Sequence, residues 1–191
     1  MSTSPAAISA EGLQRATRFV SFSTLGVLRT TQGIAQAVLD DIDGADPELV
    51  TEETLSLVAV TTARAAEVGL QNQPNAAAAA SNALVEVPYT YHEYLIGGAM
   101  VAREDSSLAE AGDGVYQRLE RKLQFYTTHL PSDQFPGQHA LTDKMALWMG
   151  RVSPPKLPES PQERLEKLNL VSNLLTHLKL VLAYGRQGSV A

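Results

Sequence analysis

Apolar side chains recur at helical spacing from the first residues of this sequence onward. After Ser9, a residue suited to capping a helix, Leu13, Val20, Val27 and Ile34 follow one another at intervals of seven residues. This spacing keeps their side chains on one face of an α-helix. The pattern predicts a long first helix that ends at the acidic segment 40–47.

The positions beside this apolar stripe carry small residues. Gly26 and Gly33 are also seven residues apart, and alanine, serine or threonine occupies the neighbouring stripe. Such a face favours the close approach of another helix backbone, because little side chain stands between the two helices. The alternative is that each glycine only weakens the helix, by about 1 kcal/mol relative to alanine.

Five further helical segments are predicted between the acidic segment and residue 152. Thr51 is expected to cap the first of them, with Glu52 and Glu53 in its first turn. Turn-forming residues separate the segments, most clearly at 105–114, where glycine, serine and aspartate are frequent. The predicted helices cover residues 51–70, 76–85, 89–103, 115–129 and 141–152.

The strongest local signal lies near the end of the sequence. Residues 153–160 form a proline-rich linker, after which Ser160 and Glu163 match a capping box with a proline at the first helical position. A helix is predicted over residues 161–185, with Gly185 as its C-terminal cap. Its apolar stripe advances in steps of three and four residues and consists of Leu168, Val171, Leu175, Leu178 and Leu182.

These segments predict an all-α protein, a helical bundle of about five to seven helices with a proline-linked amphipathic helix at its C-terminal end. Sustained alternation of apolar and polar residues does not occur, so no strand is expected. We expect residues 1–152 to form the bundle and 153–160 to be a linker. Helix 161–185 is then a packing or oligomerisation element, because its apolar face lacks an assured partner.

Composition excludes several classes of protein. Of the 191 residues, 44% are hydrophobic and 19% charged, and the formal net charge is −6. The absence of cysteine excludes disulfides, thiolate metal sites and a cysteine nucleophile. Acidic balance argues against nucleic-acid binding, which needs clustered positive charge. Polar residues interrupt the most apolar stretch, 19–39, and no signal peptide is evident, so we expect a cytoplasmic protein without membrane insertion.

Charge is unevenly distributed along the sequence. Residues 1–110 carry 5 basic and 14 acidic side chains, whereas residues 111–191 carry 10 basic and 7 acidic ones. Seven acidic residues and no basic one lie between Arg29 and Arg64. We interpret this run as a solvated turn. The alternative is that the oppositely charged halves orient one subunit against another.

The sequence offers little that could support catalysis or metal binding. In a helical bundle, a metal site favours histidine and carboxylate three or four residues apart. His139 has such a partner in Asp143, and His129 has Asp133, although Pro131 lies between them, while His92 and His177 have none at those spacings. The nucleophile motif Gly-x-Ser-x-Gly is also missing. We therefore assign no catalytic residue, no metal ligand and no cofactor.

Two aromatic segments are candidates for binding. Tyr91, His92 and Tyr94 lie within one short stretch, and tyrosine suits core edges, oligomer contacts and pocket walls alike. We interpret the segment first as an edge of the core, with an oligomer contact or a small-molecule pocket as alternatives. On the predicted helix 141–152, Met145, Trp148, Met149 and Val152 share one face. That face either packs on its own bundle or serves as an exposed docking surface.

The sequence thus favours a non-enzymatic helical interaction protein that self-assembles and has a structural or adaptor role. Its expected interface consists of the leucine stripe of helix 161–185 and the Trp148 face. The alternative is a helical sensor that binds a small molecule near Tyr91, His92 and Tyr94. A metal-dependent helical-bundle enzyme is the third hypothesis. A homo-oligomer, with a further protein partner as an option, is the predicted state.

Overall fold

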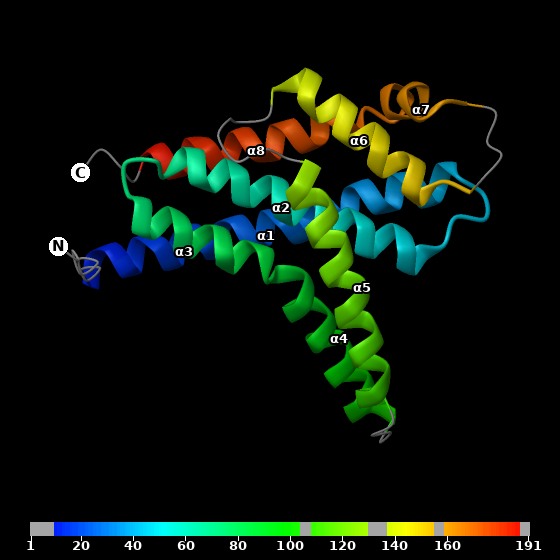
Figure 1. Ribbon diagram of the computed structural model, residues 1–191, viewed down its shortest axis with the longest axis horizontal. Helices are drawn as coiled ribbons and strands as arrows, with labels where there is room; N and C mark the ends of the chain where they lie inside the picture. The colour runs from blue at the N-terminus through cyan, green and yellow to red at the C-terminus, as the bar shows by residue number, and fades with distance from the viewer. Residues whose placement is uncertain (1–9, 104–107, 130–136, 155–158, 188–191) are drawn as a thin grey trace.

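Helix α2 (Pro47–Gly69) lies at the centre of the fold, with other helices packed around it (Figure 1). Nearly every side chain between Val50 and Ala66 is buried. A helix that is apolar or small on all sides is stable only when neighbours cover each face. Its neighbours in the body are α1 (Ala10–Asp41), α3 (Pro74–Val85), α6 (Gln138–Val152) and α8 (Leu170–Gln187).

The computed structural model describes residues 10–103, 108–129, 137–154 and 159–187, and these contain helices and no strands. The predicted all-α bundle is therefore confirmed. Helix α7 (Pro161–Lys167) and α8 are the two parts of the segment predicted as one helix, so the described helices correspond to seven predicted segments. Among the described residues, no helix is sufficiently long and apolar to cross a bilayer.

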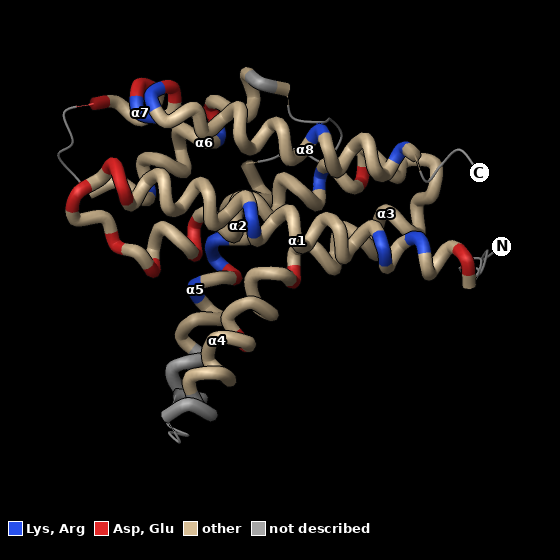
Figure 2. Tube along the Cα trace, turned by 180° about the vertical axis from the view of Figure 1, so that it is seen from behind, with Lys and Arg blue, Asp and Glu red and all other residues tan. Residues whose placement is uncertain are grey.

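Helices α4 (Val87–Arg103) and α5 (Leu108–His129) run side by side and project from the body as an arm (Figures 1 and 2). We call this pair the α4–α5 arm. The C-terminal end of α5 packs on α2. The C-terminal end of α4 and the N-terminal end of α5 extend away from the body. The predicted break at 105–114 is wrong for residues 108–114, which belong to α5. Its glycines do not stop the helix because α4 supports it from the side.

Of two helix starts predicted from local signals, one is wrong and one is confirmed. Helix α2 begins at Pro47 and not at Thr51, because Asp46 accepts hydrogen bonds from the backbone amides of Glu48 and Leu49 at 2.9 and 3.2 Å. Helix α7 begins with the predicted capping box. There, Ser160 accepts from the backbone amide of Glu163, whose carboxylate accepts from that of Ser160.

The predicted helix 161–185 is interrupted at Asn169, which adopts a φ of +52°. Asparagine tolerates this left-handed conformation better than most residues. The turn directs α8 back along α2, so that its buried face packs on the body of the same chain. Gly185 is not a C-terminal cap. It is buried inside α8, where an added Cβ would lie 3.1 Å from the backbone of Gly69 in α2.

Candidate functional site

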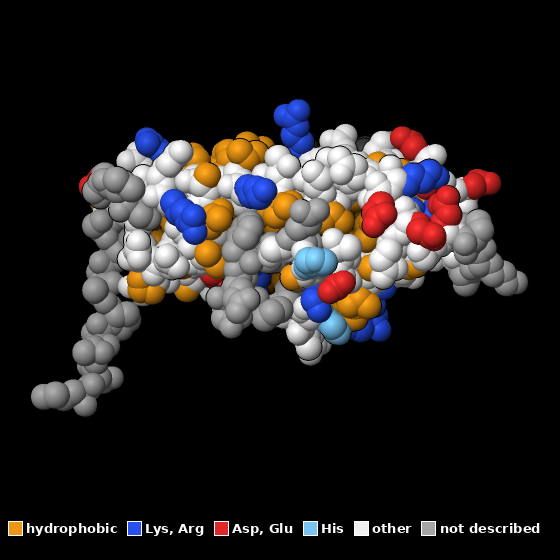
Figure 3. All heavy atoms as spheres, turned by 90° about the horizontal axis from the view of Figure 1, so that it is seen from above, with side chains coloured by type: hydrophobic (Ala, Val, Ile, Leu, Met, Phe, Trp, Pro, Cys, Tyr) orange, Lys and Arg blue, Asp and Glu red, His pale blue; other side chains and the backbone are white. Residues whose placement is uncertain are grey.

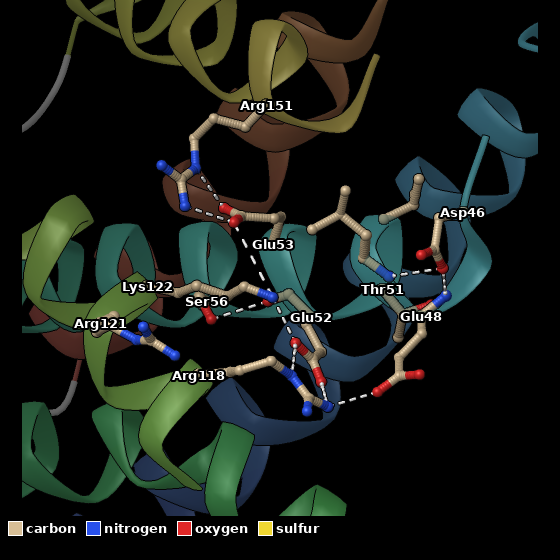
Figure 4. A network of polar contacts seen from close by, with 12 residues as sticks. Asp46, Glu48, Thr51, Glu52, Glu53, Ser56, Arg118, Arg121, Lys122 and Arg151 are labelled. Carbon is tan, nitrogen blue, oxygen red and sulfur yellow. Dashed lines mark hydrogen bonds and ion pairs between the residues drawn. The ribbon is translucent and has the colours of Figure 1, made fainter. Parts of the chain in front are cut away.

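A buried group of charged side chains joins the α4–α5 arm to the body (Figure 4). Glu52 and Glu53 of α2 each have a side chain that is only 1% exposed. Arg118 and Lys122 approach them from α5, and Arg151 approaches from α6. We call these residues, with Tyr126 of α5, the Glu52–Glu53 cluster.

Each carboxylate of the cluster has several donors. Arg118 Nη2 donates to Glu52 Oε1 at 2.9 Å, and Lys122 Nζ donates to Glu52 Oε2. Arg151 binds Glu53 in a bidentate manner, with Nε donating to Oε2 at 2.9 Å and Nη2 to Oε1 at 2.6 Å. The hydroxyl of Tyr126 donates to Glu53 Oε2 at 2.6 Å. Charged and bidentate hydrogen bonds of this kind are the strong ones in proteins.

The electrostatics of the cluster favour the ionised forms of Glu52 and Arg151 and the neutral form of Tyr126. Burial alone would raise the pKa of Glu52, but hydrogen bonds from Arg118 and Lys122 and their positive charges outweigh it, so that the pKa is lowered. Burial and the negative charge of Glu53 raise the pKa of Tyr126, which therefore keeps its proton as a donor. The hydrogen bond to Glu53 raises the pKa of Arg151.

This arrangement is better suited to holding α5 and α6 on α2 than to acid–base catalysis. Among the described residues, Glu52, Glu53 and Lys122 line none of five well-formed cavities. The carboxylates are also occupied by donors of the same chain, so a substrate would have to displace them. A general acid or base must reach the proton it transfers. The cluster therefore acts as a clamp that orients α5 and α6 on α2.

The acidic run between Arg29 and Arg64 is not a purely solvated turn. Besides the buried Glu52 and Glu53, Asp41 binds Arg164 of α7 at 2.9 Å and Lys167 at 2.7 Å. Arg164 itself is only 5% exposed. Some acidic side chains of the first part of the sequence are thus paired with basic side chains of the second part within one chain.

The structure separates the predicted ligand residues on α4. Tyr91 and Tyr94 face α1, where both line a cavity of about 370 Å³ together with Leu28. His92 contacts the edge of the Tyr91 ring but lines none of the cavities described here. Burial lowers the pKa of His92 despite the nearby charges of Glu52 and Glu48. The two tyrosines therefore form part of a surface groove, and the histidine does not.

This groove runs along α1 beside the arm. A second cavity of about 710 Å³ adjoins the first, and the two share Leu28 and Tyr91. We call them together the α1–α4 groove. Leu25, at 69% exposure, and Tyr94, at 80%, are the most exposed large hydrophobic side chains of the described residues, and both line the groove. Large apolar side chains left exposed along one groove are typical of binding surfaces.

Half of the eight residues predicted for the interface are buried in the chain's own core. Met145, Trp148 and Met149 are fully buried, so the Trp148 face packs on its own bundle and presents no docking surface. Within the leucine stripe, Leu178 is likewise buried against the body, and Leu182 is partly exposed beside Gly69. The remaining members are partly buried and pack against the core: Leu168, Val171 and Leu175.

The predicted register of the C-terminal stripe differs from the observed one. The buried face of α8 comprises Leu170, Leu174, His177, Leu178, Val181 and Gly185. The kink at Asn169 rotates α8 relative to α7, and the covered face therefore lies beside the predicted stripe. Both sets of residues are spaced at three and four, so periodicity did not distinguish them.

Metal chemistry finds no ready site in the described residues. Within them, no group of three or more histidine, aspartate and glutamate side chains is placed to hold an ion. His139 is exposed on α6, and His177 is buried between α1, α2 and α8, with its Nε2 atom 2.9 Å from the hydroxyl of Thr62.

The Glu52–Glu53 cluster was not predicted from the sequence. One signal could have indicated it: the segment from Thr54 to Ala66 is apolar or small on every side, so its preceding turn is buried as well. Two glutamates buried in that turn require cations.

Compared with known proteins, the chain matches no family model, and neither a curated protein nor a solved structure is significantly similar to it.

Proposed function

We propose that this protein is a non-enzymatic helical interaction protein that self-associates through the α1–α4 groove. The observation that carries the proposal is the pair Leu25 of α1 and Tyr94 of α4, two large apolar side chains left exposed in the two adjoining cavities of the groove. Fully burying a side chain such as Leu25 contributes about 1.5–3 kcal/mol. Covering both would remove a considerable apolar area from water.

The shape of the molecule supports a second copy as the occupant. The α4–α5 arm projects from the body (Figure 2). The groove is lined by residues of α1 and α4. The molecule thus has both a protruding apolar element, α4 with its exposed Tyr94 and Leu95, and a groove beside it. A twofold-symmetric dimer uses the same patch on both subunits, so each arm can enter the groove of the other.

The clamp described above supports the same proposal. Glu53 of the body is held by Tyr126 of α5 and Arg151 of α6, and Glu52 by Arg118 and Lys122 of α5. The arm is therefore held on the body by ion pairs and a hydrogen bond, in addition to its covalent connections. A binding surface that is ordered beforehand loses less conformational entropy on association.

Sedimentation velocity over a range of protein concentrations tests the proposal. We expect the wild-type chain to form a dimer and both Leu25→Asp and Tyr94→Asp to shift it to the monomer, because each places a charge in an apolar contact. Leu147→Asp is the matched control: Leu147 is 46% exposed on α6, outside the groove. A wild-type chain that stays monomeric, or a control that dissociates equally, would contradict the proposal.

The second candidate function is a sensor that binds a small molecule at Tyr91 and Tyr94. The observation in its favour is the apolar cavity that these tyrosines share with Leu28 and Val87. His92 is outside that cavity and is no longer expected to contact the ligand. A thermal-shift screen with small aromatic molecules tests this function, since a ligand that binds only the folded state raises the melting temperature.

A further inference from the structure

A separate cavity of about 370 Å³ lies at the end of the body where α1 begins and α8 ends. It does not share residues with the α1–α4 groove. Its size falls within the range of about 300–1,000 Å³ that small-molecule pockets occupy. The cavity is bounded by residues of α1, α3 and α8 and by the turn after α2.

Small residues explain why the helices leave this space open. Ala16 of α1, Ala76 of α3 and Gly185 of α8 all line the cavity, and none fills much volume. The close contact between Gly69 and Gly185 holds α8 against the end of α2, so the helices are not free to close the gap by shifting.

Larger apolar side chains form the walls. Phe19, Leu70 and Tyr184 line the cavity. The ring of Tyr184 is fixed from two sides, stacked on Phe22 with centroids 4.4 Å apart and tilted against Phe19 at 6.1 Å. This interior suits the apolar body of a ligand, which would leave water on binding.

The rim of the cavity is basic. Arg15 and Arg18 both line it, along with the amide side chains of Gln73 and Gln187, and no acidic residue does. Arg15 is already paired with Glu11 at 2.5 Å, whereas Arg18 makes no ion pair with any of the described residues. Figure 3 shows further basic side chains near this end of the molecule, while acidic ones gather toward the other. In a chain of net charge −6, this placement is a local exception.

We propose that this cavity binds a small amphipathic anion, a carboxylate with an alkyl body. The alkyl chain lies against the wall formed by Phe19, Leu70 and Tyr184, and the carboxylate accepts hydrogen bonds from the guanidinium of Arg18, with Gln73 or Gln187 as further donors. Arginine matches a carboxylate through two parallel hydrogen bonds. A cationic amphiphile would be repelled at the rim, and a neutral one would leave the arginine without a partner.

Isothermal titration calorimetry of the full chain with octanoate, at a concentration below micelle formation, tests the proposal. Octanamide, which has the same alkyl body without the charge, is the matched ligand. We expect the wild-type chain to bind octanoate at least tenfold more tightly than octanamide. Arg18→Gln should weaken octanoate binding about tenfold. Ala16→Leu, which fills the cavity with a residue of high helix propensity, should abolish it.

Arg29→Gln serves as the control, because Arg29 lies on the same helix but lines the α1–α4 groove. It should leave octanoate binding unchanged, which also separates this site from the surface proposed for self-association. Failure of the wild-type chain to bind octanoate would overturn the proposal, as would equal affinity for octanamide or unchanged binding by Ala16→Leu. Binding only to vesicles of phosphatidylglycerol, without binding free octanoate, would instead indicate a membrane surface and would also overturn it.

Discussion

At the scale of single residues, Gly26 and Gly33 lie seven residues apart on the same helix but have different surroundings. A Cβ on Gly26 would lie 2.5 Å from Cε1 of His177, whereas a Cβ on Gly33 would meet nothing within 4 Å. We expect Gly26→Ala to destabilise the protein by about 1–3 kcal/mol through overpacking. Gly33→Ala should stabilise it by about 0.5–1 kcal/mol, because alanine favours the helix.

Urea unfolding of the two variants, followed by circular dichroism, measures these changes in the free energy of unfolding. Each glycine variant is the other's control, since the substitution and the helix are the same. Equal effects of the same sign would show that helix propensity, and not the contact with His177, decides the outcome.

His177 couples the stability of the fold to pH. Its side chain is 7% exposed, and burial lowers its pKa to about 4. Histidine in the unfolded chain has a pKa near 6.5, so between pH 6.5 and 4 the unfolded state binds more protons. Stability contributed by neutral His177 is therefore fully present above pH 6.5 and is lost as pH falls toward 4. We expect a loss of about 2 kcal/mol between pH 7 and pH 5.

The variant His177→Gln isolates this contribution, because an amide can keep a hydrogen bond to Thr62 without titrating. Urea unfolding at pH 7 and pH 5 gives the pH dependence of both chains. The difference between them should equal the loss assigned to His177. If the wild-type chain and the variant lose the same stability, the histidine is not the group that titrates.

At the scale of helices, the Glu52–Glu53 cluster determines how α5 and α6 sit on α2. Glu53→Gln would leave Arg151 with a neutral partner and Tyr126 with a weaker acceptor. Glu53 is buried but Arg151 is 38% exposed, so water can partly solvate the charge left behind. We expect a loss of about 1.5–3 kcal/mol in the free energy of unfolding from the weakened charged hydrogen bonds.

Glu11→Gln is the matched control for this prediction. It removes the exposed ion pair between Glu11 and Arg15 on α1, and pairs of this kind contribute less than about 1 kcal/mol. Chemical denaturation of both variants provides the comparison. A Glu53 variant as stable as the control would mean that the cluster does not hold the helices together.

The helices themselves could be predicted because their signals are local. The capping box at Ser160 and the stripe from Val20 to Ile34 each involve residues that are close to one another in the sequence. The cluster could not be predicted in the same way, since Arg118 lies 66 residues from Glu52 and Arg151 lies 98 residues from Glu53. Which charges meet depends on how the helices pack, and periodicity says nothing about that.

The same reasoning explains the errors in the candidate site. Tyr91 and Tyr94, three residues apart, share a face of α4 and were brought together, whereas adjacent His92 points elsewhere. The turn at Asn169 changed which leucines are covered, because a single residue with positive φ redirects the helix that follows it. The cavity with the basic rim around Arg18 could not be predicted from the sequence either, since the residues that line it come from segments far apart in the chain.

At the scale of the whole molecule, the centre and the arm should differ in how they open. Helix α2 is covered by neighbours on every side, so its amides exchange with solvent only when the protein unfolds globally. The middle of α4 contains Gly97 and Gly98, which are exposed and have nothing within 4 Å of an added Cβ. Hydrogen exchange followed by mass spectrometry should therefore show fast exchange around these glycines and maximal protection in α2.

Replacing both glycines with alanine separates local from global opening. The double variant should slow exchange in α4, because alanine raises the cost of opening the helix there by about 1 kcal/mol at each position. Protection of α2 should stay unchanged, since its opening requires the core to separate. Equal protection of α2 and α4 in the wild-type chain would instead mean that the arm unfolds together with the body, and that the clamp at Glu53 makes the molecule a single cooperative unit.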